Sequence, residues 1–228
     1  MSNKEMLVIV PTRGRPQRIM EFYNFFINNS EVSDLCLGID DDQVEMYPKD
    51  LDAIYEINPN MKLCPKLNLI SAKYLDKYKY ICFMGDDVRT NTKGWDKMLI
   101  EPLKDKIGIT YGNDLLNGAG LPNTIVVNSE FIKELGFMSP PGIEHFFIDN
   151  FYRDTGYVLG ILKYFPDVIL EHMHPSAGKS QIDETYMSSA GIPGIATEGI
   201  VADAYKYEVY QKTQWQEDLN KLRKLIGK

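Results

Sequence analysis

Short apolar runs alternate with amphipathic segments along most of the chain. The apolar runs predict buried strands near residues 5–10, 34–39, 79–84, 107–111, 123–128 and 167–172. Helical periodicity of apolar positions occurs over residues 17–28, 66–78, 95–103, 129–135 and 143–154. Continuous apolar strands that alternate with helices favour an α/β fold, in which helices flank a mostly parallel sheet.

The chain changes character after about residue 176. Residues 188–197 are small and nearly uncharged, which predicts a loop, either a plain connector or a lid over a site. Residues 198–226 predict helix, and one apolar stripe along them suits packing or else a dimer contact: Trp215, Leu219, Leu222 and Ile226. We therefore expect a main domain over residues 1–180, with a loop and C-terminal helical extension over 181–228 packing on it.

Composition narrows the class of protein. The 228 residues are 44% apolar and 25% charged, as in an ordinary water-soluble globular protein. The net charge of −7 argues against broad binding to a nucleic-acid backbone or an anionic membrane. No apolar run approaches the roughly 20 residues of a membrane span, so we expect no membrane insertion. Cys36, Cys64 and Cys82 are odd in number and lack metal spacing, which favours reduced thiols in a cytoplasmic protein.

The most informative motif is Gly85-Asp86-Asp87, which closes the apolar run at residues 81–84. Aspartate is rarely buried unless it is paired or bound to a cation. Hard divalent cations take oxygen ligands, and Mg²⁺ sites commonly use one or two carboxylates with substrate phosphates. The motif therefore predicts a metal–nucleotide site, and the alternative is a turn that carries solvated acids.

Polar groups also follow the first two predicted strands, where ligands bind in open α/β sheets. Arg13 and Arg15 lie in a Gly/Pro-bounded turn before a predicted helix, and arginine forks suit phosphate oxygens. Asp40 is the first acid after its strand and can accept hydrogen bonds from a base or a ribose. A solvated basic turn remains the alternative for the two arginines.

The last predicted strand ends in two of the three histidines of the chain, His172 and His174. Residues two apart on a strand face the same side, and imidazole can complete an oxygen-based site for Mn²⁺. Lys179 can bring an ammonium group onto a diphosphate. Structural histidines and a surface lysine are the alternatives.

Asp149 lies among apolar and aromatic residues, between Phe147 and Tyr152, in a predicted helix. A carboxylate in such surroundings tends to have a raised pKa and can serve as a general base. The alternative is a solvated helix face.

Over residues 5–180 these features resemble the GT-A glycosyltransferases, in particular the family 2-like group and its small members in phage and bacterial genomes. Val8-Ile9-Val10-Pro11-Thr12-Arg13 is similar to that group's first strand and nucleotide loop. Asp40 matches its base-contacting aspartate, and Lys66 falls on its nucleotide-side helix. Gly85-Asp86-Asp87 is similar to its Asp-x-Asp-type metal motif, although the strict motif is missing.

The resemblance implies a GT-A-type, Rossmann-like sheet and assigns roles to three acids. Asp86 would contact the ribose or donor sugar, Asp87 would bind Mn²⁺ or Mg²⁺, and Asp149 would be the catalytic base, although no Glu-Asp pair stands there. The implied reaction is metal-dependent transfer from a nucleotide-diphosphate sugar, a UDP-sugar first of all, to an acceptor hydroxyl with inversion. Retention stays open because histidine-bearing metal sites also occur in retaining relatives.

Other readings also stay open. A sugar-phosphate nucleotidyltransferase would use a similar sheet and metal, but its Gly-rich first loop is poorly matched by residues 11–15. A non-catalytic module that binds a nucleotide sugar or a glycan would bind donor without turnover. The acceptor can be a glycan, a small molecule or a modified nucleobase. The expected location is the cytoplasm, that of the host if a phage encodes the chain.

Overall fold

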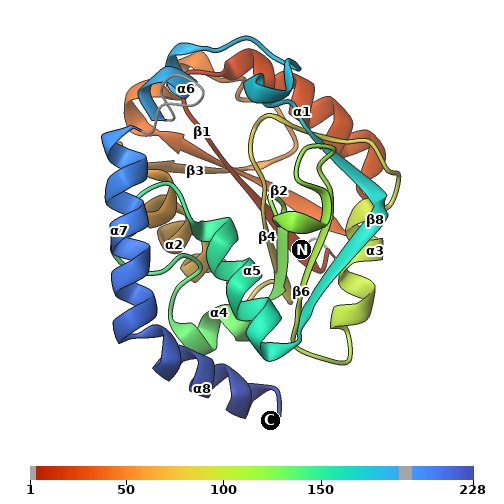
Figure 1. The fold of residues 1–228 in the computed structure, drawn as a ribbon. Coiled ribbons are helices and arrows are strands. Elements are labelled where there is room, and N and C mark those ends of the chain that lie inside the picture. The colour runs from red at the N-terminus through yellow and green to blue at the C-terminus, as the bar shows by residue number, and fades with distance from the viewer. Residues whose placement is uncertain (1–3, 190–196) are drawn as a thin grey trace.

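The computed structural model describes residues 4–189 and 197–228, which form one mixed sheet with helices on both faces (Figure 1). The strands are β1 (Met6–Thr12), β2 (Ser33–Asp40), β3 (Ile54–Asn58), β4 (Tyr80–Phe83), β5 (Val88–Thr90), β6 (Ile109–Asn113), β7 (Ile125–Asn128) and β8 (Leu162–His172). The helices are α1 (Pro16–Asn29), α2 (Leu63–Tyr74), α3 (Trp95–Ile100), α4 (Ser129–Leu135), α5 (Ile148–Leu159), α6 (Glu184–Ser189), α7 (Glu198–Thr213) and α8 (Trp215–Leu225). The predicted α/β class is confirmed.

The strands follow the order β3-β2-β1-β4-β7-β6-β8-β5 across the sheet. Strands β1, β2, β3 and β4 are mutually parallel, and β6 is parallel to β8. Strand β7 is antiparallel to both of its neighbours, β4 and β6. The pairings β4–β7 and β7–β6 are both antiparallel, so β6 runs in the same direction as β4, and β8 runs parallel to β6. Strands β1, β2, β4 and β8 therefore all end at the same edge of the sheet. The four strand ends that carry the predicted chemistry are thereby brought to one edge.

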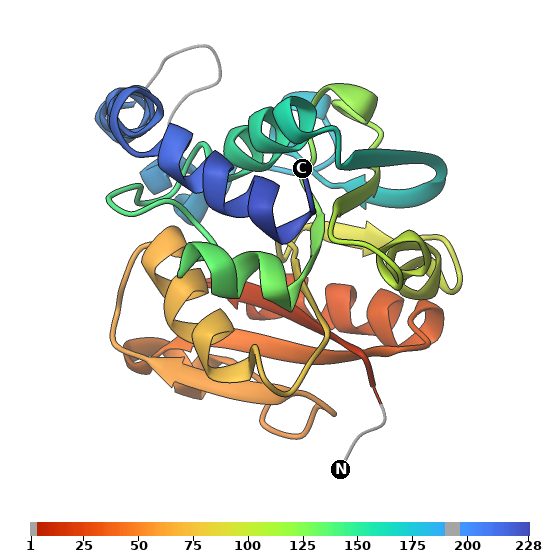
Figure 2. The ribbon, with the colours of Figure 1, turned by 90° about the horizontal axis from the view of Figure 1, so that it is seen from below.

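Alternate residues of the buried strands pack into two cores. Leu7 and Ile9 of β1 contact a cluster built with α2, α4, α5, α7 and α8. Met6, Val8 and Val10 face the opposite cluster, built with α1 and α3. Figure 2 shows α4, α5 and α8 stacked on one side of the sheet. Both faces of the central strands are thus covered, which explains their continuous apolar sequence.

The C-terminal helices are part of the larger core. Leu219 and Leu222 of the predicted stripe are buried in it, and Trp215 and Ile226 pack against it. The predicted packing role of the stripe is therefore confirmed. Helix α7 begins with Thr197 as its N-cap, whose Oγ1 accepts a hydrogen bond from the Ile200 amide at 3.3 Å.

Several features differ from the sequence prediction. Strands β3 and β5 were not predicted, and the predicted helix over 143–154 begins only at Ile148. Phe147, directly before it, has φ of +70°, which a helix interior does not allow. Residues 188 and 189 of the predicted loop end α6, and residues 190–196 lie outside the described residues.

No helix within residues 4–189 and 197–228 is long and apolar enough to cross a membrane.

Candidate active site

A cleft of about 760 Å³ opens at the edge where β1, β2, β4 and β8 end. This volume is in the range of small-molecule sites. Eleven of the twelve residues singled out from the sequence line it: Pro11, Thr12, Arg13, Arg15, Asp40, Lys66, Asp86, Asp87, Asp149, His172 and His174. Residues far apart in the sequence are therefore gathered in one cleft.

Lys179 is the remaining predicted residue, and it lines a smaller pocket of about 220 Å³ beside Asp86 and Asp87. Its ammonium nitrogen is 2.9 Å from Glu171 Oε1. Lys179 is therefore close to the acidic motif but already paired.

Asp40 ends β2 and is only 1% exposed. Its two oxygens pair with different cations, Oδ2 with Arg13 Nη1 at 2.7 Å and Oδ1 with the Lys66 ammonium group. Lys66 comes from α2, so the ion pair joins two elements of the cleft wall. Arg13 is also bound by Asp42, whose hydrogen bonds, with those of Asp40, raise the pKa of the guanidinium. Two cations thus compensate one buried carboxylate, as burial of a charge requires.

The turn after β1 brings a second arginine into the cleft. Gly14 has φ of +68°, and Pro16 occupies the first turn of α1, where a missing amide costs nothing. Arg15, between them, donates from Nη1 to Asp86 Oδ1 at 3.0 Å. Thr12 donates to the other oxygen of Asp86 at 2.8 Å.

Asp86 and Asp87 lie in the turn from β4 to β5, and their environments differ. Asp86 is 6% exposed, and burial together with the neighbouring charge of Asp87 raises its pKa to about 6. Burial acts to raise the Asp87 pKa, but the contact with His172, together with the charges of Arg15 and Arg18, outweighs it and lowers that pKa. A Cβ at Gly85 would lie 2.7 Å from Asp87 Oδ1, so a larger residue there would displace this carboxylate. The pair therefore favours one ionised acid, Asp87, beside one that takes up a proton more readily.

His172 ends β8 with Nε2 3.4 Å from Asp87 Oδ1. Its Nδ1 is 3.2 Å from the amide nitrogen of Asn123, which also donates to Asp114. The sequence analysis missed Asn123 and Asp114, because neither stands in a motif. An amide nitrogen only donates, so Nδ1 accepts and the ring proton of neutral His172 lies on Nε2, towards Asp87.

His174 follows the strand, and its ring centroid is 5.0 Å from that of His172. Its Nδ1 accepts a hydrogen bond from the Ser176 amide at 3.2 Å. Tyr186 of α6 packs edge-on against its other side, with ring centroids 5.2 Å apart. The two histidine rings are adjacent, and it is His172 whose Nε2 lies within ion-pair distance of Asp87.

The fit of a divalent cation depends mainly on Asp87. Its ionised carboxylate is a suitable oxygen ligand, and a separation of 3.4 Å allows Asp87 and His172 to share one ion. If His172 binds the ion through Nε2, the ring proton must move from Nε2 to Nδ1. The side-chain amide of Asn123, which now donates to Nδ1, must then turn so that its oxygen accepts that proton. Within residues 4–189 and 197–228, no three acidic, histidine or cysteine side chains lie close enough together to hold a metal ion by themselves. The residues therefore fit an ion that takes its other ligands from a nucleotide and water.

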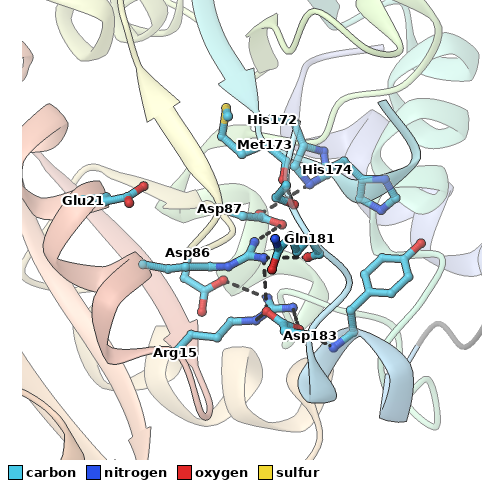
Figure 3. A network of polar contacts seen from close by, with 12 residues as sticks. Arg15, Glu21, Asp86, Asp87, His172, Met173, His174, Gln181 and Asp183 are labelled. Atoms are coloured by element: carbon cyan, nitrogen blue, oxygen red, sulfur yellow. Dashed lines mark hydrogen bonds and ion pairs between the residues drawn. The ribbon is translucent and has the colours of Figure 1, made fainter. Parts of the chain in front are cut away.

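A second network, which the sequence did not predict, covers the arginines (Figure 3). Asp183, just before α6, accepts two hydrogen bonds from Arg15, Nε to Oδ2 and Nη2 to Oδ1, both 2.9 Å long. Arg18 of α1 adds an ion pair to Asp183 at 3.1 Å and lies 3.7 Å from Asp87. The carboxylate of Asp183 thus occupies the bidentate face of Arg15, which is the geometry that phosphate also prefers.

This arrangement leads to a prediction for Asp183→Asn. A phosphate that binds Arg15 must compete with the carboxylate of Asp183. Removing the charge of that carboxylate should therefore tighten the binding of UDP or GDP roughly three- to tenfold. Titration calorimetry at one fixed Mn²⁺ concentration measures the affinity of each variant. Glu184→Gln, an equal loss of charge at the exposed next position, is the control and should leave affinity unchanged. Equal or weaker binding by Asp183→Asn would contradict the competition.

Asp149 lies in the first turn of α5, on the cleft wall. Burial raises its pKa, although the Asn150 amide, at 3.0 Å from Oδ1, and the charge of Arg153 act in the opposite direction. His145, Phe146 and Phe147 line the cleft beside it. The arrangement supplies a carboxylate that can accept a proton in a largely apolar wall.

No family model matches the chain, and no curated protein matches it in sequence. Solved structures do match. S. aureus TarS has a TM-score of 0.56 and 15% identity over 73% of this chain, which spans only 36% of the TarS chain. The mannosyltransferase PcManGT from Pyrobaculum calidifontis, in complex with GDP-Man and Mn²⁺, has a TM-score of 0.56 and 14% identity over 95% of this chain and 72% of that one.

A CMP:2-keto-3-deoxy-manno-octonic acid synthetase complexed with CTP is also similar, with a TM-score of 0.51 and 10% identity over 77% of this chain and 96% of that one. At such identities the likeness concerns the fold alone. The chain therefore has the GT-A-type, Rossmann-like fold that the sequence predicts.

Proposed function

We propose that the chain is a metal-dependent glycosyltransferase, which moves a sugar from a nucleotide-diphosphate sugar to an acceptor hydroxyl. The observation that carries this proposal is the single cleft in which phosphate-type arginines, the Asp86-Asp87 motif and Asp149 meet. The fold match to a mannosyltransferase in complex with GDP-Man and Mn²⁺ supports the donor class and the metal. A UDP-sugar remains the first donor to test.

In the proposed complex, the nucleoside lies against Asp40, Arg13 and Lys66, and the diphosphate lies against Arg15. Arg18 joins Arg15 when the phosphates replace Asp183, because Asp183 now bridges the two guanidinium groups. Asp86 holds the ribose or the donor sugar. Lys179 can assist the leaving diphosphate only if it gives up Glu171.

Asp87, with His172, would hold Mn²⁺ or Mg²⁺, which when bound neutralises charge on the diphosphate. His174 is adjacent and stays a candidate ligand. Asp149 takes the proton of the acceptor hydroxyl as the acceptor oxygen bonds to the anomeric carbon. The bond from that carbon to the phosphate oxygen breaks, and the nucleoside diphosphate leaves with the electron pair. A single displacement of this kind inverts the anomeric carbon.

The first experiment is a thermal-shift panel of nucleotide sugars and bare nucleotides, with and without Mn²⁺. A ligand at about 100 times its dissociation constant stabilises the fold by about 2.7 kcal/mol, so the melting temperature should rise by roughly 5–10 °C. We expect such a rise with one UDP- or GDP-sugar, and only with Mn²⁺. No shift with any nucleotide in the presence of metal would contradict the proposal.

The fold match to a CTP-bound synthetase supports a second candidate, a sugar nucleotidyltransferase. The two candidates differ in the products they release. A nucleotidyltransferase forms pyrophosphate from a nucleoside triphosphate and a sugar or sugar phosphate, whereas a glycosyltransferase releases a nucleoside diphosphate from a nucleotide sugar. Assaying both products in parallel separates them, and we expect only the diphosphate.

Further features of the chain are proposals of the same kind. We infer a catalytic unit over residues 1–180 with the segment 181–228 as its extension, although Tyr186 and Ile200 of the extension line the cleft. The three cysteines are free and buried, which supports a cytoplasmic location. A glycan, a small molecule and a modified nucleobase are the acceptors to be tested.

A further inference from the structure

Three consecutive backbone amides converge on one carboxylate of the C-terminal extension. Asp203 of α7 is 2% exposed, and its oxygens accept hydrogen bonds from the amides of Glu144 at 3.1 Å, His145 at 2.8 Å and Phe146 at 3.0 Å. Burial alone would raise the Asp203 pKa, but these three bonds and Lys206 lower it. The carboxylate is therefore ionised and grips the loop over residues 144–147.

The same face of α7 makes two further contacts with this region. Tyr207, one turn after Asp203, stacks on Phe147 with ring centroids 5.7 Å apart and an interplanar angle of 25°. Ile200, almost one turn before Asp203, lines the cleft. Three residues at helical spacing thus face the loop and the cleft, so α7 contributes directly to the surroundings of the site.

The backbone at Phe147 explains why the loop needs such a grip. Its φ of +70° is unfavourable for a bulky residue and persists only where the surrounding structure imposes it. Helix α5 begins at the next residue, and Asp149 lies in its first turn. The strained turn at Phe147 therefore sets where Asp149 enters the cleft.

We propose that Asp203 is a positioning residue for the transfer reaction: its carboxylate holds the 144–147 loop and so fixes Asp149 against the acceptor. The proposal rests on the proposed function, because it takes Asp149 as the base. Asp203 lies behind the loop rather than in the lining of the cleft, so it acts through the loop. A misplacement of the base by about 1 Å can lower the rate about 100-fold.

The test compares Asp203→Asn with Asp218→Asn. Asp218 of α8 is an equally buried carboxylate, 1% exposed, and it accepts hydrogen bonds from Tyr210 and Lys221. The asparagine at 203 retains the shape of the side chain but presents an amide group to backbone donors. Both variants remove one buried charge, so a general loss of stability should affect them alike.

Three readouts separate positioning from a purely structural role. Amide hydrogen exchange at residues 144–146 should speed up at least tenfold in Asp203→Asn relative to Asp218→Asn. The kcat for transfer should fall about 10- to 100-fold, while the thermal shift given by the nucleotide donor stays that of the wild type. The acid limb of the pH–rate profile should move to lower pH, because a looser loop admits water to Asp149 and lowers its pKa.

Tyr207→Leu is the second variant, in case Asp203→Asn does not fold. It removes the stacking on Phe147 and should change the same three readouts in the same direction. Unchanged exchange at residues 144–146, or a kcat equal to that of the control variant, would overturn the proposal. If the wild-type protein transfers no sugar, the proposed function fails, whereas the exchange measurement still decides whether Asp203 holds the loop.

Discussion

Asp87→Asn is expected to abolish metal-dependent nucleotide binding and to lower sugar transfer at least about a thousandfold, or about 4 kcal/mol of transition-state stabilisation. The substitution retains the size of the side chain and removes its charge. Asp87 is the acid of the pair whose pKa is lowered, so its charge is present at neutral pH. Without that charge the diphosphate loses the cation that neutralises it. Titration with Mn²⁺ and a nucleotide sugar, followed by turnover measurements, checks both effects.

Asp42→Asn is the matched control, because it removes a carboxylate that binds Arg13, a residue of the same cleft. Asp42 is exposed and binds Arg13, so its loss should weaken nucleotide binding only a few-fold. A small effect in that variant and a large one in Asp87→Asn would place the metal at Asp87. Turnover above a tenth of the wild-type rate in Asp87→Asn would remove this acid from the proposed metal site.

Asp86, the residue before it in the chain, should behave differently from Asp87. Its side chain is bound by Thr12 and Arg15 and is less exposed, and its raised pKa of about 6 reflects that burial. The two neighbouring acids thus have different properties. Asp87 stays ionised and suits a cation, whereas Asp86 provides hydrogen-bonding oxygens in a fixed position. This division follows from the protein environment, since the two residue types are identical.

The sequence predicted the acid motif and the strand ends because each rests on a local pattern. An apolar strand followed by polar residues can be recognised at β1, β2, β4 and β8 without knowledge of the partner strands. The short β5 was missed because three residues with an arginine in the middle form no periodic signal. Strand β7 was predicted near residues 123–128, but its antiparallel direction was not, since strand direction depends on pairing rather than on composition.

The residues that support the site could not be predicted in the same way. Asp183 is 168 residues from Arg15 in the chain, and Asp203 is 57 to 59 residues from the amides it binds. Asp183 stands beside Glu184 and Asp203 follows a short apolar run, so neither belongs to an acid motif at a strand end. Most such acids are solvated. The predicted helix over 143–154 failed at its start for a related reason: Asp203 satisfies amides that a helix would otherwise use, and Phe147 turns the backbone aside. Hydrogen bonds between backbone amides and a side chain far away in the sequence produce no periodic pattern that a prediction could use.

The second large effect is expected for Asp149→Asn, which should lower kcat by about 10²- to 10⁴-fold and leave donor binding unchanged. An asparagine cannot take the acceptor proton, whereas the arginines and Asp87 still hold the donor. Asp154→Asn on the same helix is the control, because its side chain still accepts the hydrogen bond from Tyr207 and should transfer sugar nearly as well as the wild type. Equal kcat in the wild type and Asp149→Asn would remove the base role.

The pH–rate profile tests the same assignment independently. A base works in its ionised form, so the rate falls as the pH drops through the pKa of Asp149. Burial raises that pKa above the ordinary aspartate value of about 4, and the acid limb of the wild-type profile should therefore lie above pH 4. Asp149→Asn should lose this limb, whereas Asp154→Asn should retain it. An acid limb that persists unchanged in Asp149→Asn would belong to another group. The acceptor proton would then be taken by a group other than Asp149.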